Sequence, residues 1–169
     1  HIAIQYPTIN LVHHLQWDRP VLRIGICQHA EAHNFLDFGA ALGDAIARSD
    51  ARVGILASGG MSHRFPTLDT SSNHVKTAAE HVISAEARAF DEAVLARWAR
   101  GEHAGVIDSY PDYKPFKPEG LLGHYLIMAG ALGGRDWNAP GAQLSEYENA
   151  FGTGQVHVWF DLTNDRQPA

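Results

Sequence analysis

The chain has 169 residues, of which 45% are apolar, so it can bury a hydrophobic core in about one domain and is not a disordered chain. Its formal net charge of -6 argues against a generic binder of nucleic acid or of an anionic membrane. No stretch approaches the roughly 20 apolar residues of a membrane helix. The single cysteine, Cys27, allows no internal disulfide, and we interpret it as a small buried residue in a cytoplasmic protein.

Short strands and helices alternate along the first half of the chain. Residues 2–12 alternate weakly in hydropathy, which predicts a strand followed by an irregular segment. Residues 21–26 are rich in β-branched residues and predict a strand, and the apolar run at 53–57 is typical of a buried parallel strand. Apolar residues at helical spacing predict a helix over residues 34–48, with Asn34 as its N-cap.

The second half is mostly helical. We expect helix over much of residues 70–100 and a proline-rich and aromatic loop at 110–118. A helix over residues 119–132 is apolar on most faces and is therefore expected to be buried, and Gly133 ends it. Residues 155–160 predict a hairpin or terminal strand. Alternating helices and strands predict an α/β fold in which layered helices surround a mixed or mostly parallel central sheet.

His63 stands where the predicted strand at 53–57 runs into the glycine-rich turn Ser-Gly-Gly-Met-Ser-His at 58–63. The ends of such strands are where open α/β sheets usually place their chemistry. Histidine titrates near neutral pH, so His63 is a candidate general acid or base. A loop histidine satisfied by local hydrogen bonds is the competing interpretation, and position alone leaves both open.

Glu119 is expected at the start of the buried helix, on the same face as Leu122 and Tyr125. A carboxylate that faces a core needs a metal or a cation as its partner. Pattern alone favours the alternative, a first-turn glutamate stabilised by the helix dipole. His124, near the middle of this helix, is more typical of a core histidine than of a ligand.

Two histidine pairs are candidate metal ligands. His29 and His33 have the i, i+4 spacing that places both on one side of a helix. They lack the glutamate that follows the first histidine in a zinc-protease helix, because Ala30 stands there. His13 and His14 are adjacent, so on a strand they would point to opposite faces.

The Gly-Gly-Met-Ser-His run at residues 59–63 resembles the class III extradiol ring-cleavage dioxygenases, the superfamily of the protocatechuate 4,5-dioxygenase catalytic subunit. The tail also looks like the gallate and methylgallate branch. The resemblance covers most of residues 1–169 but only the C-terminal half of a typical member. We therefore expect a single domain that is the C-terminal part of a larger catalytic domain. The segments that agree in order are 38–46, 58–63, 89–91 and 126–132, and the tail segments are 145–149 and 152–155.

The resemblance implies one non-haem Fe(II) held by two histidines and one carboxylate, with open positions for a catecholic substrate and dioxygen. His63 would be the acid/base that acts on the substrate hydroxyl and on bound oxygen. The carboxylate ligand would come from the helix that ends in Gly-Ala-Leu. Glu119 is the acidic residue of that helix and the expected ligand, although an ungapped match places Leu121 at the ligand position. Both histidine ligands belong to the N-terminal half of family members, so no histidine of this chain is assigned to them.

Three hypotheses follow. The first is an Fe(II) extradiol dioxygenase whose N-terminal half lies in a partner chain or in further sequence; the start at His1 rather than Met fits this. The second is a non-catalytic subunit or binding domain of the same fold that lacks the iron ligands. Both predict an exposed apolar surface for docking, and family members commonly form oligomers. The third is a metallohydrolase that binds zinc through His29 and His33.

Overall fold

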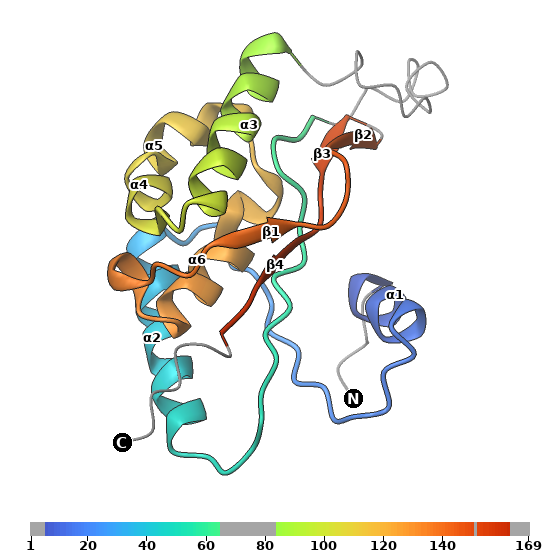
Figure 1. Ribbon diagram of the computed structural model, residues 1–169, viewed down its shortest axis with the longest axis vertical. Coiled ribbons are helices and arrows are strands. Elements are labelled where there is room, and N and C mark those ends of the chain that lie inside the picture. The colour runs from blue at the N-terminus through green and yellow to red at the C-terminus, as the bar shows by residue number, and fades with distance from the viewer. Residues whose placement is uncertain (1–5, 65–83, 151, 163–169) are drawn as a thin grey trace.

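The computed structural model describes residues 6–64, 84–150 and 152–162 (Figure 1). None of the helices in these ranges is long and apolar enough to cross a bilayer. The helices α2 and α6 pack side by side, and α3 to α5 form a second group beside them (Figure 1). The helices are α1 (Tyr6–His14), α2 (Ala32–Ala47), α3 (Ala85–Ala99), α4 (His103–Asp108), α5 (Tyr110–Tyr113) and α6 (Gly123–Ala131). The described ranges also hold single turns of 3-10 helix at η3 (Lys114–Phe116), η4 (Glu119–Leu122) and η5 (Gly134–Asp136).

The strands form two small antiparallel pairs. β1 (Gly141–Gln143) pairs with β4 (Val158–Phe160), and β2 (Glu148–Ala150) pairs with β3 (Thr153–Gln155). The predicted mixed or parallel central sheet is not confirmed, because both sheets in the described ranges are two-stranded and antiparallel. Of the two alternatives predicted for residues 155–160, the terminal strand is confirmed as β4, whereas the hairpin is wrong because β3 and β4 pair with β2 and β1 and not with each other.

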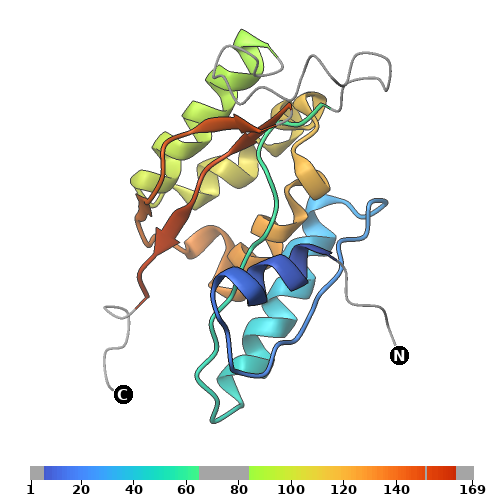
Figure 2. The same ribbon diagram turned by 90° about the vertical axis from the view of Figure 1, so that its right-hand side faces the viewer.

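The segments 21–26 and 53–57, predicted as strands, are extended but belong to neither sheet in the part of the chain that the structure describes (Figure 2). Some apolar side chains of each segment, such as Ile24 and Ile55, pack against the core. Others face solvent, and Leu22 is 81% exposed. The alternation expected of a strand is therefore partly present, while backbone pairing is not. The exposed apolar residues here are Val21, Leu22, Val53 and Leu56, which is the kind of surface that the sequence predicted for docking.

Local predictions near the N-terminus need two corrections. The strand expected at residues 2–12 is wrong over its described part, because α1 begins at Tyr6. Pro7 stands in the first turn of this helix, where its missing N–H breaks no hydrogen bond. α2 is confirmed, but its N-cap is Glu31 and not Asn34, which is the third helical residue and accepts a hydrogen bond from the Glu31 N–H at 2.9 Å.

The helices predicted at residues 70–100 and 119–132 are confirmed as α3 and α6. α3 lies within the predicted helix 70–100, of which residues 70–83 lie outside the described ranges. Ser84 caps it by accepting a hydrogen bond from Ala87 N at 3.1 Å. α6 is buried as expected and ends before Gly133, whose φ of 113° suits glycine.

The core holds a buried histidine, His103, stacked on Trp137 with ring centroids 3.5 Å apart. Its Nε2 lies 2.9 Å from the Ala139 carbonyl oxygen and its Nδ1 lies 2.9 Å from the Tyr125 hydroxyl. The carbonyl only accepts, so Nε2 donates to it and Nδ1 accepts from Tyr125. Burial lowers the pKa of His103 below its usual value, although the bond to Ala139 opposes this. His103 is therefore neutral in the folded protein near pH 7.

Acidification should destabilise the protein through His103. In the unfolded chain this side chain titrates near pH 6.5, whereas in the folded protein it takes up its proton at lower pH. The unfolded state thus binds more protons as pH falls below 6.5, and the free energy of unfolding decreases by up to about 1.4 kcal/mol per pH unit. Urea denaturation between pH 7 and pH 5 should give a shallower pH dependence for His103→Gln. Equal slopes for the two proteins would contradict this.

The contact between α2 and α6 depends on Gly130. A Cβ atom at this position would overlap the Leu36 carbonyl oxygen, which is backbone and cannot move aside cheaply. Gly130→Ala should therefore lower the free energy of unfolding by about 1–3 kcal/mol, as overpacking does. In Gly105→Ala, the matched control within α4, the nearest atom would lie 3.6 Å away, and better helix propensity should raise stability by up to about 1 kcal/mol. Urea denaturation measures both, and equal effects would refute the packing argument.

Candidate active site

The turn at residues 59–63, called here the 59–63 turn, is attached to β3 by backbone hydrogen bonds. Met61 N donates to the Gly154 carbonyl at 2.8 Å, and Gly154 N donates to the Ser62 carbonyl at 2.9 Å. An isolated antiparallel bridge joins His63 to Thr153. The turn therefore continues the sheet formed by β2 and β3, and its backbone position is defined on this side.

On its other side the 59–63 turn contacts η3 and η4. His63 N donates to the Phe116 carbonyl at 3.1 Å, and Glu119 N donates to the Met61 carbonyl at 3.1 Å. The half-buried Glu119 side chain returns to the same turn, where its Oε2 accepts a hydrogen bond from Gly60 N at 2.5 Å. One five-residue turn thus brings together the two residues predicted to carry the chemistry: His63 is its last residue, and Glu119 hydrogen-bonds to it.

The backbone that presents Glu119 has an unusual conformation. Leu121 and Leu122 have φ values of 55° and 54°, in the left-handed region that non-glycine residues avoid. This conformation separates η4 from α6, so Glu119 precedes the helix and does not occupy its first turn as predicted. Strained backbone of this kind clusters at functional sites. Leu121, the ungapped match to the ligand position, is half-buried and offers no metal-binding atom.

The half-buried imidazole of His63 has a defined hydrogen-bond partner. Its Nδ1 lies 2.5 Å from the Thr153 hydroxyl oxygen. Thr153 itself is only 6% exposed. His63 thus lies at the end of the turn that follows the apolar segment 53–57. Its contact with Thr153 of β3 is not indicated by any local sequence pattern.

Asp91, fully buried on α3, connects the 59–63 turn to the rest of the protein. Its carboxylate accepts hydrogen bonds from the Ser62 hydroxyl, the Tyr113 hydroxyl and the Tyr147 hydroxyl, each at 2.6 Å, and from Ser62 N at 3.2 Å. Burial and the neighbouring carboxylate raise the pKa of both tyrosines well above the usual range. Asp91 was not among the site residues predicted from the sequence. The available signal was its helical spacing to Val94, because it is an acidic residue on the apolar face of α3.

His124 lies beside Glu119 at the start of α6. Its half-buried ring packs against Gly59, where a Cβ atom would come within 2.5 Å of the ring. Burial lowers the pKa of His124 to about 4, and the charge of Glu119 opposes the shift only in part. His124 is therefore neutral at pH 7. The sequence predicted a core histidine at this position, but His124 is only half-buried and its ring faces the 59–63 turn.

The remaining sequence candidates lie elsewhere. His29 occupies a turn before α2 and His33 lies in α2, so the predicted shared helix face is wrong, and both side chains are exposed. His13 and His14 end α1 and not a strand, and their rings contact each other edge-on at 5.3 Å. Cys27 is exposed, so its interpretation as a buried residue is also wrong.

The described residues do not form a complete metal site. Within the ranges 6–64, 84–150 and 152–162, no group of three or more His, Cys, Asp or Glu side chains is placed to hold a metal ion. Glu119 offers a single carboxylate, which fits one ligand of a two-histidine, one-carboxylate site. The other ligands are not supplied by residues that the structure describes.

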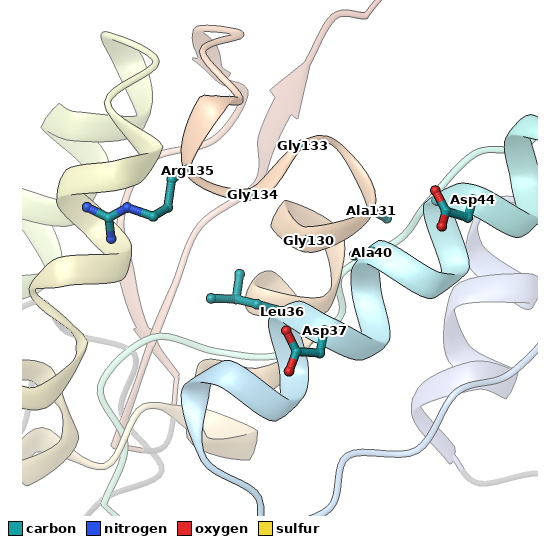
Figure 3. Close-up of a pocket in the computed structure, with 10 residues that line it drawn as sticks. Leu36, Asp37, Ala40, Asp44, Gly130, Ala131, Gly133, Gly134 and Arg135 are labelled. Carbon is teal, nitrogen blue, oxygen red and sulfur yellow. The ribbon is translucent and has the colours of Figure 1, made fainter.

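A groove of about 470 Å³ lies between α2, the end of α6 and η5 (Figure 3). Asp37 and Asp44 border it from α2. Arg135 also borders it, but its guanidinium forms an exposed ion pair with Asp108. Residues of the 59–63 turn and Glu119 do not line this groove. It is therefore separate from the candidate active site.

Comparison with known proteins identifies the family of the chain. Residues 17–160 match the family described as the catalytic LigB subunit of aromatic ring-opening dioxygenase, and the chain belongs to that family. It thereby belongs to the class III extradiol superfamily, as predicted, and family membership implies the dioxygenase fold. It is also similar to 3,4-dihydroxyphenylacetate 2,3-dioxygenase of Escherichia coli, with 26% identity over 140 residues. That match covers 78% of this chain and 48% of the relative, so the chain spans about half the relative's length. The gallate branch stays a prediction.

Proposed function

We propose that this chain carries the acid/base histidine and the carboxylate metal ligand of an extradiol dioxygenase that opens the ring of a catecholic compound with dioxygen. The observation that supports this most directly is that Glu119 accepts a hydrogen bond from the 59–63 turn, whose last residue is His63. Their attachments, Glu119 to Gly60 and His63 to Thr153, come from segments far apart in the sequence. Family membership supplies the reaction class.

In this proposal His63 moves the proton of the substrate. A catechol hydroxyl must lose its proton before the ring is attacked, and a positioned imidazole can take that proton and return it to the product. The half-buried ring of His63 is anchored on one nitrogen by Thr153, so its orientation is defined. The family's non-haem iron, when bound, would supply the site at which the diol and dioxygen meet.

Glu119 is proposed as the carboxylate ligand of that iron. Its Oε2 already accepts a hydrogen bond from Gly60 N, and such support orients metal-binding carboxylates. The two histidine ligands would come from the half of the relative's length that this chain does not span, in the same polypeptide or in a partner chain.

The exposed apolar side chains of segments 21–26 and 53–57 are the surface that we expect this other half to cover. Assembly into an oligomer belongs to the same proposal.

The second candidate is a non-catalytic subunit or binding domain of the same fold. The incomplete set of metal-binding side chains in the described ranges and the apolar Leu121 favour it. Under this alternative, the chain would stabilise a catalytic partner or bind an aromatic ligand without oxidising it.

Iron content and oxygen uptake separate the two candidates. The gene product that contains this chain is loaded with Fe(II) without oxygen, its iron is quantified, and a panel of catechols is added with dioxygen. The dioxygenase predicts bound iron and uptake of one O2 per ring opened, followed by the visible absorbance of the ring-opened product. Iron-free protein that cleaves none of the catechols would favour the non-catalytic subunit. Intact mass and N-terminal sequencing establish which residues precede His1.

A further inference from the structure

We propose that Thr153 is the positioning residue that fixes the orientation of His63, with its hydroxyl accepting a hydrogen bond from Nδ1–H. The inference rests on the proposed acid/base role of His63 and concerns the group that prepares its ring for that role. It assigns a function to a residue of β3 that is 90 positions away in the sequence.

The backbone around Thr153 is held in place on both sides. Gly154 N donates to the Ser62 carbonyl at 2.9 Å, and Arg64 N donates to the Gly152 carbonyl at 3.0 Å. These two bonds flank the bridge between Thr153 and His63. The Cα atoms of the two residues therefore have a defined separation, and their side chains leave the sheet side by side.

The rotamer of Thr153 is restricted as well. Its Cγ2 methyl packs over Gly60, where a Cβ atom would overlap it. Thr153 is 6% exposed, so its side chain has little room to turn. With the methyl group directed at Gly60, the hydroxyl lies 2.5 Å from His63 Nδ1. A β-branched residue fits here because one branch packs and the other forms the hydrogen bond.

The proposed role of His63 assigns the donor and the acceptor in this contact. A neutral imidazole has one N–H and one lone pair, and a hydroxyl can accept from the N–H or donate to the lone pair, so the contact by itself fits either tautomer. For His63 to accept a substrate proton at Nε2, Nδ1 must be protonated and donate to the Thr153 oxygen. We therefore assign Nδ1–H as the donor. The hydroxyl is uncharged, so it orients the ring without adding a second negative charge to a site that already holds Glu119.

Two substitutions separate the hydroxyl from the methyl group. Thr153→Val keeps the shape and the contact with Gly60 but removes the hydrogen bond, whereas Thr153→Ser keeps the hydroxyl and removes the methyl group. In ¹⁵N-histidine-labelled protein at pH 8, the His63 resonances are assigned by their absence in His63→Phe. We expect Nδ1 to be protonated in the native protein and in Thr153→Ser, and to lose protonation in Thr153→Val. An unprotonated Nδ1 in the native protein, or an unchanged spectrum in Thr153→Val, would overturn the inference.

The kinetic arm uses the iron-loaded gene product. Thr153→Val should lower kcat for ring cleavage about tenfold, a part of the 10²–10⁴-fold that a positioned acid/base contributes, with KM changed less than about twofold. Thr153→Ser should recover most of this loss. Native kcat in Thr153→Val would overturn the positioning role even if the tautomer changes. Native activity in His63→Phe would instead refute the proposed function, while the NMR result still decides the tautomer.

Discussion

Replacement of His63 by phenylalanine is expected to lower the rate of ring cleavage by about 10²–10⁴-fold, the usual contribution of a positioned acid/base. Phenylalanine keeps a planar ring at the end of the 59–63 turn but has no nitrogen to exchange a proton. The backbone bond from residue 63 to the Phe116 carbonyl does not depend on the side chain, so the fold should persist. Oxygen uptake under saturating catechol measures the loss, and circular dichroism checks the fold.

Two comparisons make this result specific. His157→Phe changes an exposed histidine between β3 and β4 and should leave the rate within about twofold of the native protein, as surface substitutions away from special features usually do. The iron content of His63→Phe should equal that of the native protein, because His63 is proposed as acid/base and not as a ligand. Full ring cleavage by His63→Phe would exclude the acid/base role. A loss of iron together with activity would assign His63 to the metal instead.

Replacement of Asp91 by alanine is expected to cost about 3–5 kcal/mol of unfolding free energy, comparable to breaking a buried charged network. The carboxylate is fully buried and accepts hydrogen bonds from Ser62, Tyr113 and Tyr147. Its removal leaves three hydroxyls and the Ser62 N–H without that acceptor, and each unsatisfied buried group costs about 1–3 kcal/mol before relaxation. Urea denaturation at pH 7 measures the change.

Glu92 is the matched control for this experiment. It follows Asp91 on α3 but forms only an exposed ion pair with Arg88 at 2.8 Å. Glu92→Ala should therefore cost less than about 1 kcal/mol. Tyr147→Phe removes one of the Asp91 donors and should cost about 1 kcal/mol. Equal stability of the Asp91 and Glu92 variants would contradict a structural role for the buried carboxylate.

Periodic apolar patterns and a short motif determined α2, α3, α6 and one site residue, whereas α1 lies where a strand was predicted and α5 lies in the predicted loop at 110–118. α2 follows from apolar residues at helical spacing, and α6 follows from a nearly uniform apolar run that Gly133 ends. The position of His63 follows from an apolar segment that enters a glycine-rich turn. These features are local: a helix closes its own hydrogen bonds within four residues, so neighbouring side chains carry most of the information.

The tertiary structure decided the pairing of distant segments. Segments 21–26 and 53–57 have residues typical of strands, but a strand also needs a partner, and none lies within the described ranges. Likewise, Glu119 contacts the 59–63 turn from η4, which a left-handed backbone at Leu121 and Leu122 separates from α6. Asp91 and Thr153 contact that turn across 29 and 90 positions of sequence. Contacts of this kind depend on which surfaces meet in the folded chain, and no local periodicity encodes that choice.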